Sequence, residues 1–128
     1  MKTDYDLAGR VIGIAMEVHR TLGPGFVESV YENALLVELA ASQLAFESQK
    51  ALKVIYKNQC VGEFVADIIV DKTLIIELKS VQILLPIHEV QLVNYLTATG
   101  IEEGVLLNFG SESLQFKKKF RKPKPKNA

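Results

Sequence analysis

Apolar positions in the first part of the chain recur with the spacing of two helices. From about Asp6 to Leu22 they fall three or four residues apart, which is the period of an amphipathic helix. The stretch "GPG" at residues 23–25 ends this helix because glycine and proline interrupt helical backbone. A segment rich in Ala, Leu and Glu, from about Val27 to Gln43, predicts a second helix.

The middle of the chain changes to runs of β-branched and aromatic residues. Such residues favour strands, and the short segments "KNQ" and "DK" between the runs favour turns. We therefore expect an antiparallel meander. Its three strands are expected at residues 51–56, 60–70 and 73–81.

The second half of the chain returns to a helix and then to strands. Pro86 suits the first turn of a third helix, which runs to about Thr99 and is closed by Gly100. Two more strands are expected at residues 104–109 and 113–120, the last at a sheet edge. The order ααβββαββ predicts an α/β (α+β) fold in which helices flank a mixed β-sheet.

Length and composition indicate one globular domain. The 128 residues are 48% hydrophobic and 23% charged, so we expect a single domain over residues 1–120. No apolar run approaches the ~20 residues of a membrane span, and the N-terminus lacks the apolar core of a signal peptide. We therefore expect a cytoplasmic protein with no membrane contact. The single cysteine, Cys60, is expected to be a small buried strand residue.

Charge is divided unevenly along the chain. Residues 117–126 hold seven of the fifteen Lys and Arg, so the rest carries eight basic against fifteen acidic residues. The body is thus strongly acidic and the end strongly basic. Residues 121–128 are expected to form a disordered basic tail, and residues 117–126 either contact phosphates or are only solvated.

Asp67, Glu77 and Lys79 interrupt two apolar strands. Strand side chains alternate, so Glu77 and Lys79 share one face of the sheet. Asp67 lies opposite Glu77 only if Val70 pairs with Leu74, which leaves a three-residue loop at positions 71–73; a two-residue loop would turn Asp67 to the other face.

Two neighbouring carboxylates repel each other unless one is protonated or both share a cation. Carboxylate oxygens suit Mg²⁺ or Mn²⁺, and Lys79 beside them is able to stabilise charge during metal-assisted phosphodiester hydrolysis. The alternative from these residues alone is a structural ion pair of Lys79 with Asp67 or Glu77.

A wider pattern favours the metal site. Asp67 followed by Glu77-x-Lys79 on a hairpin resembles the PD-(D/E)XK nuclease superfamily, although Ala66 stands where the superfamily has proline. "GFVESVY" at 25–31 resembles the Gly-x-x-Glu-x-x-Tyr signature of the GxxExxY family, a RecB-like group within it. The resemblance spans roughly residues 5–120 and implies a restriction-endonuclease-like fold.

The resemblance also implies roles for individual residues. Asp67 and Glu77 would bind Mg²⁺ or Mn²⁺ together with the main-chain oxygen of Leu78, and Lys79 would be the catalytic lysine. Glu28 would act as a catalytic and metal-binding glutamate from the N-terminal helices. Gln91 and Tyr95, four residues apart on the third helix, and Tyr31 would contact substrate.

Plain structural readings remain open for the residues outside the hairpin. Glu28 could favour a helix N-terminus, Gln91 and Tyr95 could satisfy each other, and Tyr31 could be a packing residue. His88 is either a supporting group on the same helix or a surface histidine.

Two functions follow from these readings. The first is a divalent-metal-dependent nuclease-like protein that hydrolyses phosphodiester bonds of DNA or RNA with a metal-activated water. The second is a catalytically silent nuclease-fold protein that binds nucleic acid or assembles with itself. A homodimer or larger homo-oligomer would give a small domain a wider surface to hold its substrate.

Overall fold

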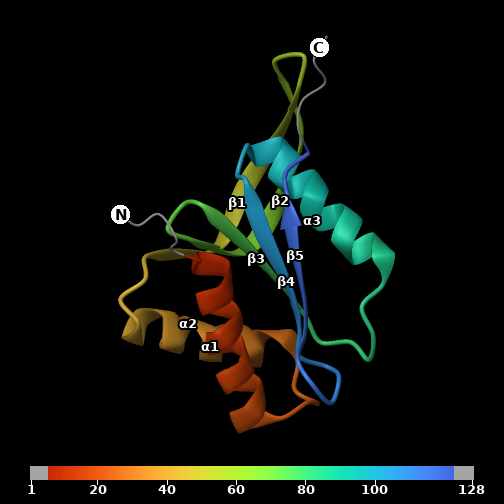
Figure 1. Cartoon of the computed structure of the whole chain (residues 1–128). Helices are drawn as coiled ribbons and strands as arrows, with labels where there is room; N and C mark the ends of the chain where they lie inside the picture. The colour runs from red at the N-terminus through yellow and green to blue at the C-terminus, as the bar shows by residue number, and fades with distance from the viewer. Residues whose placement is uncertain (1–5, 123–128) are drawn as a thin grey trace.

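The computed structural model of the chain describes residues 6–122, which form three helices and five strands (Figure 1). In chain order these are α1 (Leu7–Leu22), α2 (Glu28–Ala41), β1 (Phe46–Tyr56), β2 (Gln59–Val70), β3 (Leu74–Lys79), α3 (Pro86–Thr99), β4 (Glu103–Asn108) and β5 (Gln115–Phe120). The order ααβββαββ and the α+β class agree with the sequence prediction.

The five strands form one mixed sheet in the order β1-β2-β3-β4-β5. Strands β3 and β4 are parallel, the other neighbours are antiparallel, and β5 lies at an edge as expected. Val70 pairs with Leu74 and Ile68 with Ile76, so residues 71–73 form the three-residue loop of the predicted register. Of the two registers considered, the structure has the one that places Asp67 opposite Glu77.

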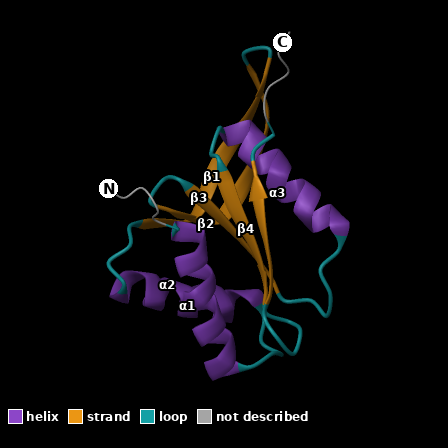
Figure 2. Cartoon of the chain, in the orientation of Figure 1, coloured by secondary structure: helices purple, strands orange, loops and turns teal. Residues whose placement is uncertain are grey.

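Each face of the sheet is covered by helices (Figure 2). On one face, Ile68, Ile76 and Leu107 pack against α1 and α2. On the other, Ile75 and Leu106 pack against the buried side of α3. Because α3 has only two fully buried residues, Leu92 and Leu96, it covers its face more loosely than the α1–α2 pair covers the other.

The β1–β2 hairpin changes direction near Asp67 and projects as an arm beyond the helices (Figure 1). Ile68 packs toward α1 and α2, whereas Ala66, two residues earlier, packs toward α3, so the alternation reverses between them. On β1 the reversal falls at Gln49, whose φ of 52° is unusual for a non-glycine residue.

Cys60 lies near the tip of this arm and is exposed, so the expectation of a buried cysteine is wrong. Cys60 pairs with Ile55, which is itself exposed, because the tip of the arm has no helix packed on it.

The ends of the elements differ little from the predictions. The Asp6 carboxylate accepts the Gly9 N–H and caps α1, and α2 begins at Glu28 rather than Val27. The largest error is β1, which begins at Phe46, five residues before the expected start. The segment "FESQK" has mostly polar residues because β1 is an edge strand, so it carries little of the apolar signal that marks a buried strand.

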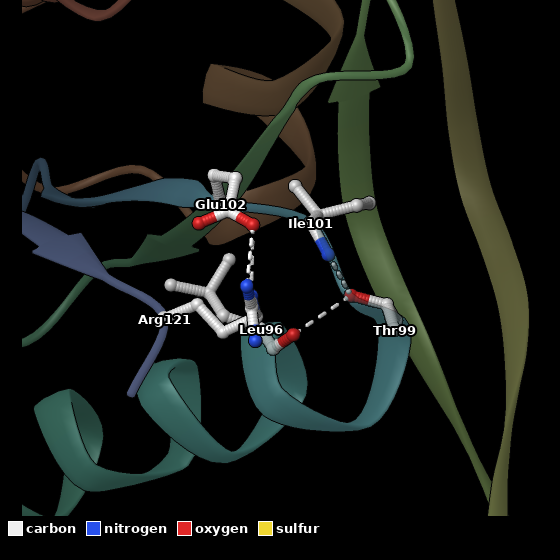
Figure 3. Close-up of polar contacts among 5 residues, drawn as sticks. All are labelled: Leu96, Thr99, Ile101, Glu102 and Arg121. Carbon is white, nitrogen blue, oxygen red and sulfur yellow. Dashed lines mark hydrogen bonds and ion pairs between the residues drawn. The ribbon is translucent and has the colours of Figure 1, made fainter. Parts of the chain in front are cut away.

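The end of β5 is fixed to the turn after α3 (Figure 3). The Thr99 hydroxyl donates to Leu96 O and accepts the Ile101 N–H, while the Arg121 guanidinium donates to the Glu102 carboxylate at 2.6 and 3.0 Å. Arg121, the first residue of the expected tail, is thus held against the domain. Lys122 is exposed, and residues 123–128 of that tail lie outside the described ones. Within residues 6–122, no helix has both the length and the apolar character that crossing a membrane requires.

Candidate active site

Asp67 and Glu77 meet where β2 and β3 separate. The last regular pair is Ile68 with Ile76. Beyond it, hydrogen bonds from main chain to side chain take the place of the main-chain bonds between the two strands. Asp67 Oδ2 accepts the Leu78 N–H at 2.8 Å, and Glu77 Oε2 accepts the Asp67 N–H at 3.1 Å. The two half-buried carboxylates are thus brought together by bonds to each other's strands, as the register requires.

The electrostatics of this pair are unfavourable for two negative charges. Burial, followed by the negative charge of Asp67, raises the pKa of Glu77 to about 8. The Lys79 charge acts in the opposite direction, but Lys79 forms no ion pair with an acidic side chain anywhere in residues 6–122. The structural ion pair considered for Lys79 is therefore not observed.

The donor atoms of the pair fit a hard cation. Asp67 Oδ1 has only a long contact of 3.4 Å, to Gln49 Nε2, and Glu77 Oε1 accepts no hydrogen bond from the described residues. Each carboxylate thus keeps one oxygen available for a metal. Mg²⁺ typically takes one or two carboxylates and retains several waters. No cluster of three or more His, Cys, Asp or Glu side chains able to hold a metal occurs within residues 6–122, so such an ion would rely on few protein ligands.

Helix α2 directs two glutamates toward this end of the sheet. Glu28 is exposed at the first position of α2, and its charge contributes to the raised pKa of Glu77. Glu32, one turn later, accepts hydrogen bonds from the Ser48 hydroxyl and from Gln49 Nε2, which also approaches Asp67. Neither Glu32 nor Gln49 was predicted from the sequence. The signal for Glu32 was its spacing of four from Glu28, whereas nothing local marks Gln49.

Tyr31 does not reach the surface. Its side chain is 0% exposed and its ring stacks on Phe109 with centroids 4.6 Å apart. The hydroxyl donates to Gly23 O at 2.5 Å and accepts the Phe26 N–H at 3.1 Å. The expectation that Tyr31 contacts substrate is therefore corrected, because its polar atom is already used to hold the loop before α2.

This contact gives a physical reason for the spacing Gly25-x-x-Glu28-x-x-Tyr31. Gly25 has φ 113°, a backbone conformation that side chains rarely tolerate. Tyr31 lies almost one turn after Glu28 and fastens the loop that precedes it, so Glu28 begins α2 at a defined position.

Of the residues considered on helix α3, Tyr95 is the one that lies near the carboxylate pair. The Tyr95 ring stacks on Phe64 of the arm, with centroids 3.9 Å apart. Burial, then the charges of Glu77 and Asp67, raise the pKa of Tyr95, so its hydroxyl lies within the field of the carboxylate pair. Gln91 is exposed one turn earlier. His88 Nδ1 accepts the Leu85 N–H, which gives this histidine a role in starting the helix.

Asn108 organises the loop that follows β3. It is fully buried; its Oδ1 accepts the N–H groups of Val81 and Gly110, and its Nδ2 donates to Val81 O and Gln115 Oε1. Nearby, the Ser80 hydroxyl donates to Phe26 O at 2.7 Å. Sequence reasoning gave Asn108 no role, although an amide inside the apolar run "LLNFG" was a signal.

A hollow of about 470 Å³ lies at this end of the sheet, beside the carboxyl ends of the parallel strands β3 and β4. Its lining is formed by the loop before α2 with the first residue of that helix, the loop after β3, and the second residue after β4. These residues are Gly25, Phe26, Val27, Glu28, Ser80, Val81, Gln82 and Gly110.

Comparison with known proteins identifies the family and the fold. A family model described as the PD-(D/E)XK nuclease superfamily matches residues 5–122. The crystal structure of SSO0001 is similar, with a TM-score of 0.61 and 17% identity, over 76% of this chain and 52% of that one. The chain thus spans about half the length of the SSO0001 chain, and the likeness concerns the fold. No curated protein matches the sequence.

Proposed function

Because the chain belongs to the PD-(D/E)XK nuclease superfamily, we propose that it is a divalent-metal-dependent nuclease. The reaction would be hydrolysis of phosphodiester bonds in DNA or RNA. Within the superfamily we propose that it is a RecB-like member of the GxxExxY group, on the residues Gly25, Glu28 and Tyr31. The restriction-endonuclease-like fold, a mixed sheet between helices, provides the scaffold.

One observation carries the proposal: Asp67 and Glu77 are brought together by reciprocal bonds to each other's strands, and each keeps one carboxylate oxygen available. With the Leu78 main-chain oxygen they would hold Mg²⁺ or Mn²⁺. When bound, the cation activates water for attack and offsets negative charge on the phosphate. The raised pKa of Glu77 supports this assignment, because a cation would relieve the repulsion that favours its protonation.

The other residues of the site have distinct proposed roles. Lys79 would stabilise charge that develops on the phosphate, since it has no ion-pair partner among residues 6–122 that would neutralise its ammonium group. Glu28 would assist at the metal from α2. Gln91 and Tyr95 would contact substrate from α3, whereas Tyr31 positions the loop before Glu28.

A catalytically silent, nucleic-acid-binding or self-assembling module is the second candidate. Two observations favour its self-assembling form over a nuclease. The body is acidic, with eight basic and fifteen acidic residues outside 117–126, and so opposes the approach of nucleic acid, and residues 6–122 contain no three-ligand metal cluster. Self-association as a homodimer or larger oligomer would widen the surface in either case.

Digestion of single- and double-stranded DNA and RNA by the purified protein separates the candidates. We expect cleavage with Mg²⁺ or Mn²⁺, none with EDTA, and a loss of about 100-fold or more in Lys79→Ala. Lys72→Ala is the matched control, because Lys72 is an exposed lysine in the turn of the same hairpin. No cleavage of any substrate by the parent would favour the silent module. Cleavage that persists unchanged in Lys79→Ala would mean that the activity does not come from the proposed site.

A further inference from the structure

Phe26 is an aromatic residue whose main chain is held in place while its ring is left accessible. The side chain is 46% exposed at the wall of the 470 Å³ hollow. Its N–H donates to the Tyr31 hydroxyl, its carbonyl accepts the Ser80 hydroxyl, and its ring meets that of Tyr31 edge to face at 6.0 Å. Both main-chain polar groups are thus fixed by side chains, so little conformational freedom is lost when a ligand binds to the ring.

The hollow shares one residue with the proposed active site and borders another. Glu28 forms part of its lining, and Ser80, another lining residue, directly follows Lys79. Its volume lies within the range of small-molecule sites, about 300–1,000 Å³. The wall opposite the loop before α2 is rigid as well, because Asn108 binds both main-chain polar groups of Val81.

We propose that this hollow holds one unpaired nucleobase of the substrate strand, stacked on Phe26, with the Gln82 side chain at the polar edge of the base. The inference rests on the proposed nuclease function and narrows its substrate to single strands or frayed ends, because a base inside a duplex has no free face to offer the ring.

Charge supports a base, rather than phosphate alone, as the group that is recognised. The body of the protein is acidic, and the hollow itself contains Glu28 and no basic side chain. Attraction of phosphates is therefore weak at this surface. Stacking is effective here because every base has a π face and the contact does not depend on positive charge.

Two fluorescein-labelled oligonucleotides of equal length and charge test the proposal: a single-stranded 12-mer of deoxynucleotides and the same sugar–phosphate chain with abasic sites throughout. Binding is measured by anisotropy in Ca²⁺, a hard cation that carboxylates can hold. We expect the parent protein to prefer the base-bearing strand by about tenfold. Phe26→Ala should lose most of this preference, and Phe26→Trp should retain it.

Phe120→Ala is the matched control, since Phe120 is 62% exposed but pairs with Glu103 at the opposite end of β4. The base site is overturned if the parent binds both oligonucleotides equally or if Phe26→Ala keeps the preference of the parent. Either result is still compatible with a nuclease that binds the sugar–phosphate backbone. No binding of either strand contradicts the nuclease and the base site together. If Phe26→Ala changed the oligomeric state of the protein in solution, the ring would belong to a contact between copies, and the proposal would be overturned.

Discussion

Asp67 and Glu77 each accept a backbone N–H from the other's strand, with Glu77 Oε2 on Asp67 N at 3.1 Å and Asp67 Oδ2 on Leu78 N at 2.8 Å. The ladder between β2 and β3 ends at the preceding pair, so these bonds satisfy backbone groups that would otherwise lack partners. The same bonds fix two acidic side chains near each other. The site and the end of the ladder are thus a single structural feature.

The first prediction concerns pH and the metal-free protein. The pKa of Glu77 is raised from 4.5 to about 8, so between these values the folded protein retains a proton that the unfolded chain releases. The stabilisation from this proton is complete below the unfolded pKa and is lost as pH rises toward 8. We expect the contribution of Glu77 to the free energy of unfolding to fall by at most about 1.4 kcal/mol per pH unit.

Urea denaturation in EDTA at pH 5 to 8.5 measures this dependence. Glu77→Gln should flatten the decline, whereas Glu63→Gln, an exposed glutamate on β2, should follow the parent. A Glu77→Gln variant with the same decline as the parent would mean that Glu77 is not the group that takes up the proton.

The second prediction concerns the Tyr31 hydroxyl. Tyr31→Phe keeps the ring stacked on Phe109 but leaves Gly23 O and the Phe26 N–H without their partner. We expect the free energy of unfolding to fall by about 1–2 kcal/mol. Tyr56→Phe, at the exposed tip of the arm, should change it by less than about 0.5 kcal/mol. If the two variants had the same free energy of unfolding, the Tyr31 hydroxyl would not stabilise the loop before α2.

The third prediction concerns the basic end of the chain. Lys118, Lys119 and Arg121 already pair with the acidic residues Asp6, Glu89 and Glu102. Phosphate contact would therefore fall mainly to the remaining basic residues of the segment, Lys117, Lys122, Lys124 and Lys126.

Deletion of residues 123–128 removes Lys124 and Lys126. If both contact duplex DNA, the log–log slope of affinity against salt should become shallower by about 1.8, since each neutralised phosphate contributes about 0.9. The stability of the domain should not change. An unchanged salt slope would mean that these residues are solvated and that nucleic acid is held elsewhere.

The sequence was sufficient for features that depend on local alternation. Alternation placed Glu77 and Lys79 on one face, and the requirement that Asp67 lie opposite Glu77 then predicted the pairing of Val70 with Leu74, which the structure confirms. The start and the end of α3 were predicted from Pro86 and Gly100, and the structure has the helix between them.

Features that depend on long-range packing were missed. The reversal at Gln49 has no local signal in the sequence. Cys60 is exposed because no helix packs on the tip of the arm, which a local pattern also does not reveal. The burial of Tyr31 follows from its stacking on Phe109, seventy-eight positions later in the chain. The network of Glu32, Gln49 and Asp67 joins three separate elements, so it is visible only after they are assembled.

The fourth prediction concerns the central claim, that Asp67 and Glu77 share a divalent cation, and metal binding tests that claim most directly. Calorimetric titration of the parent with Mn²⁺ should show binding that strengthens as pH rises toward 8, because protonation of Glu77 competes with the metal. Asp67→Asn and Glu77→Gln should each weaken binding by at least about tenfold. Asp71→Asn, in the exposed turn of the same hairpin, should bind like the parent. If both carboxylate variants also bind like the parent, or if the parent binds no Mn²⁺, Asp67 and Glu77 only close the end of the strand pair and the claim is wrong.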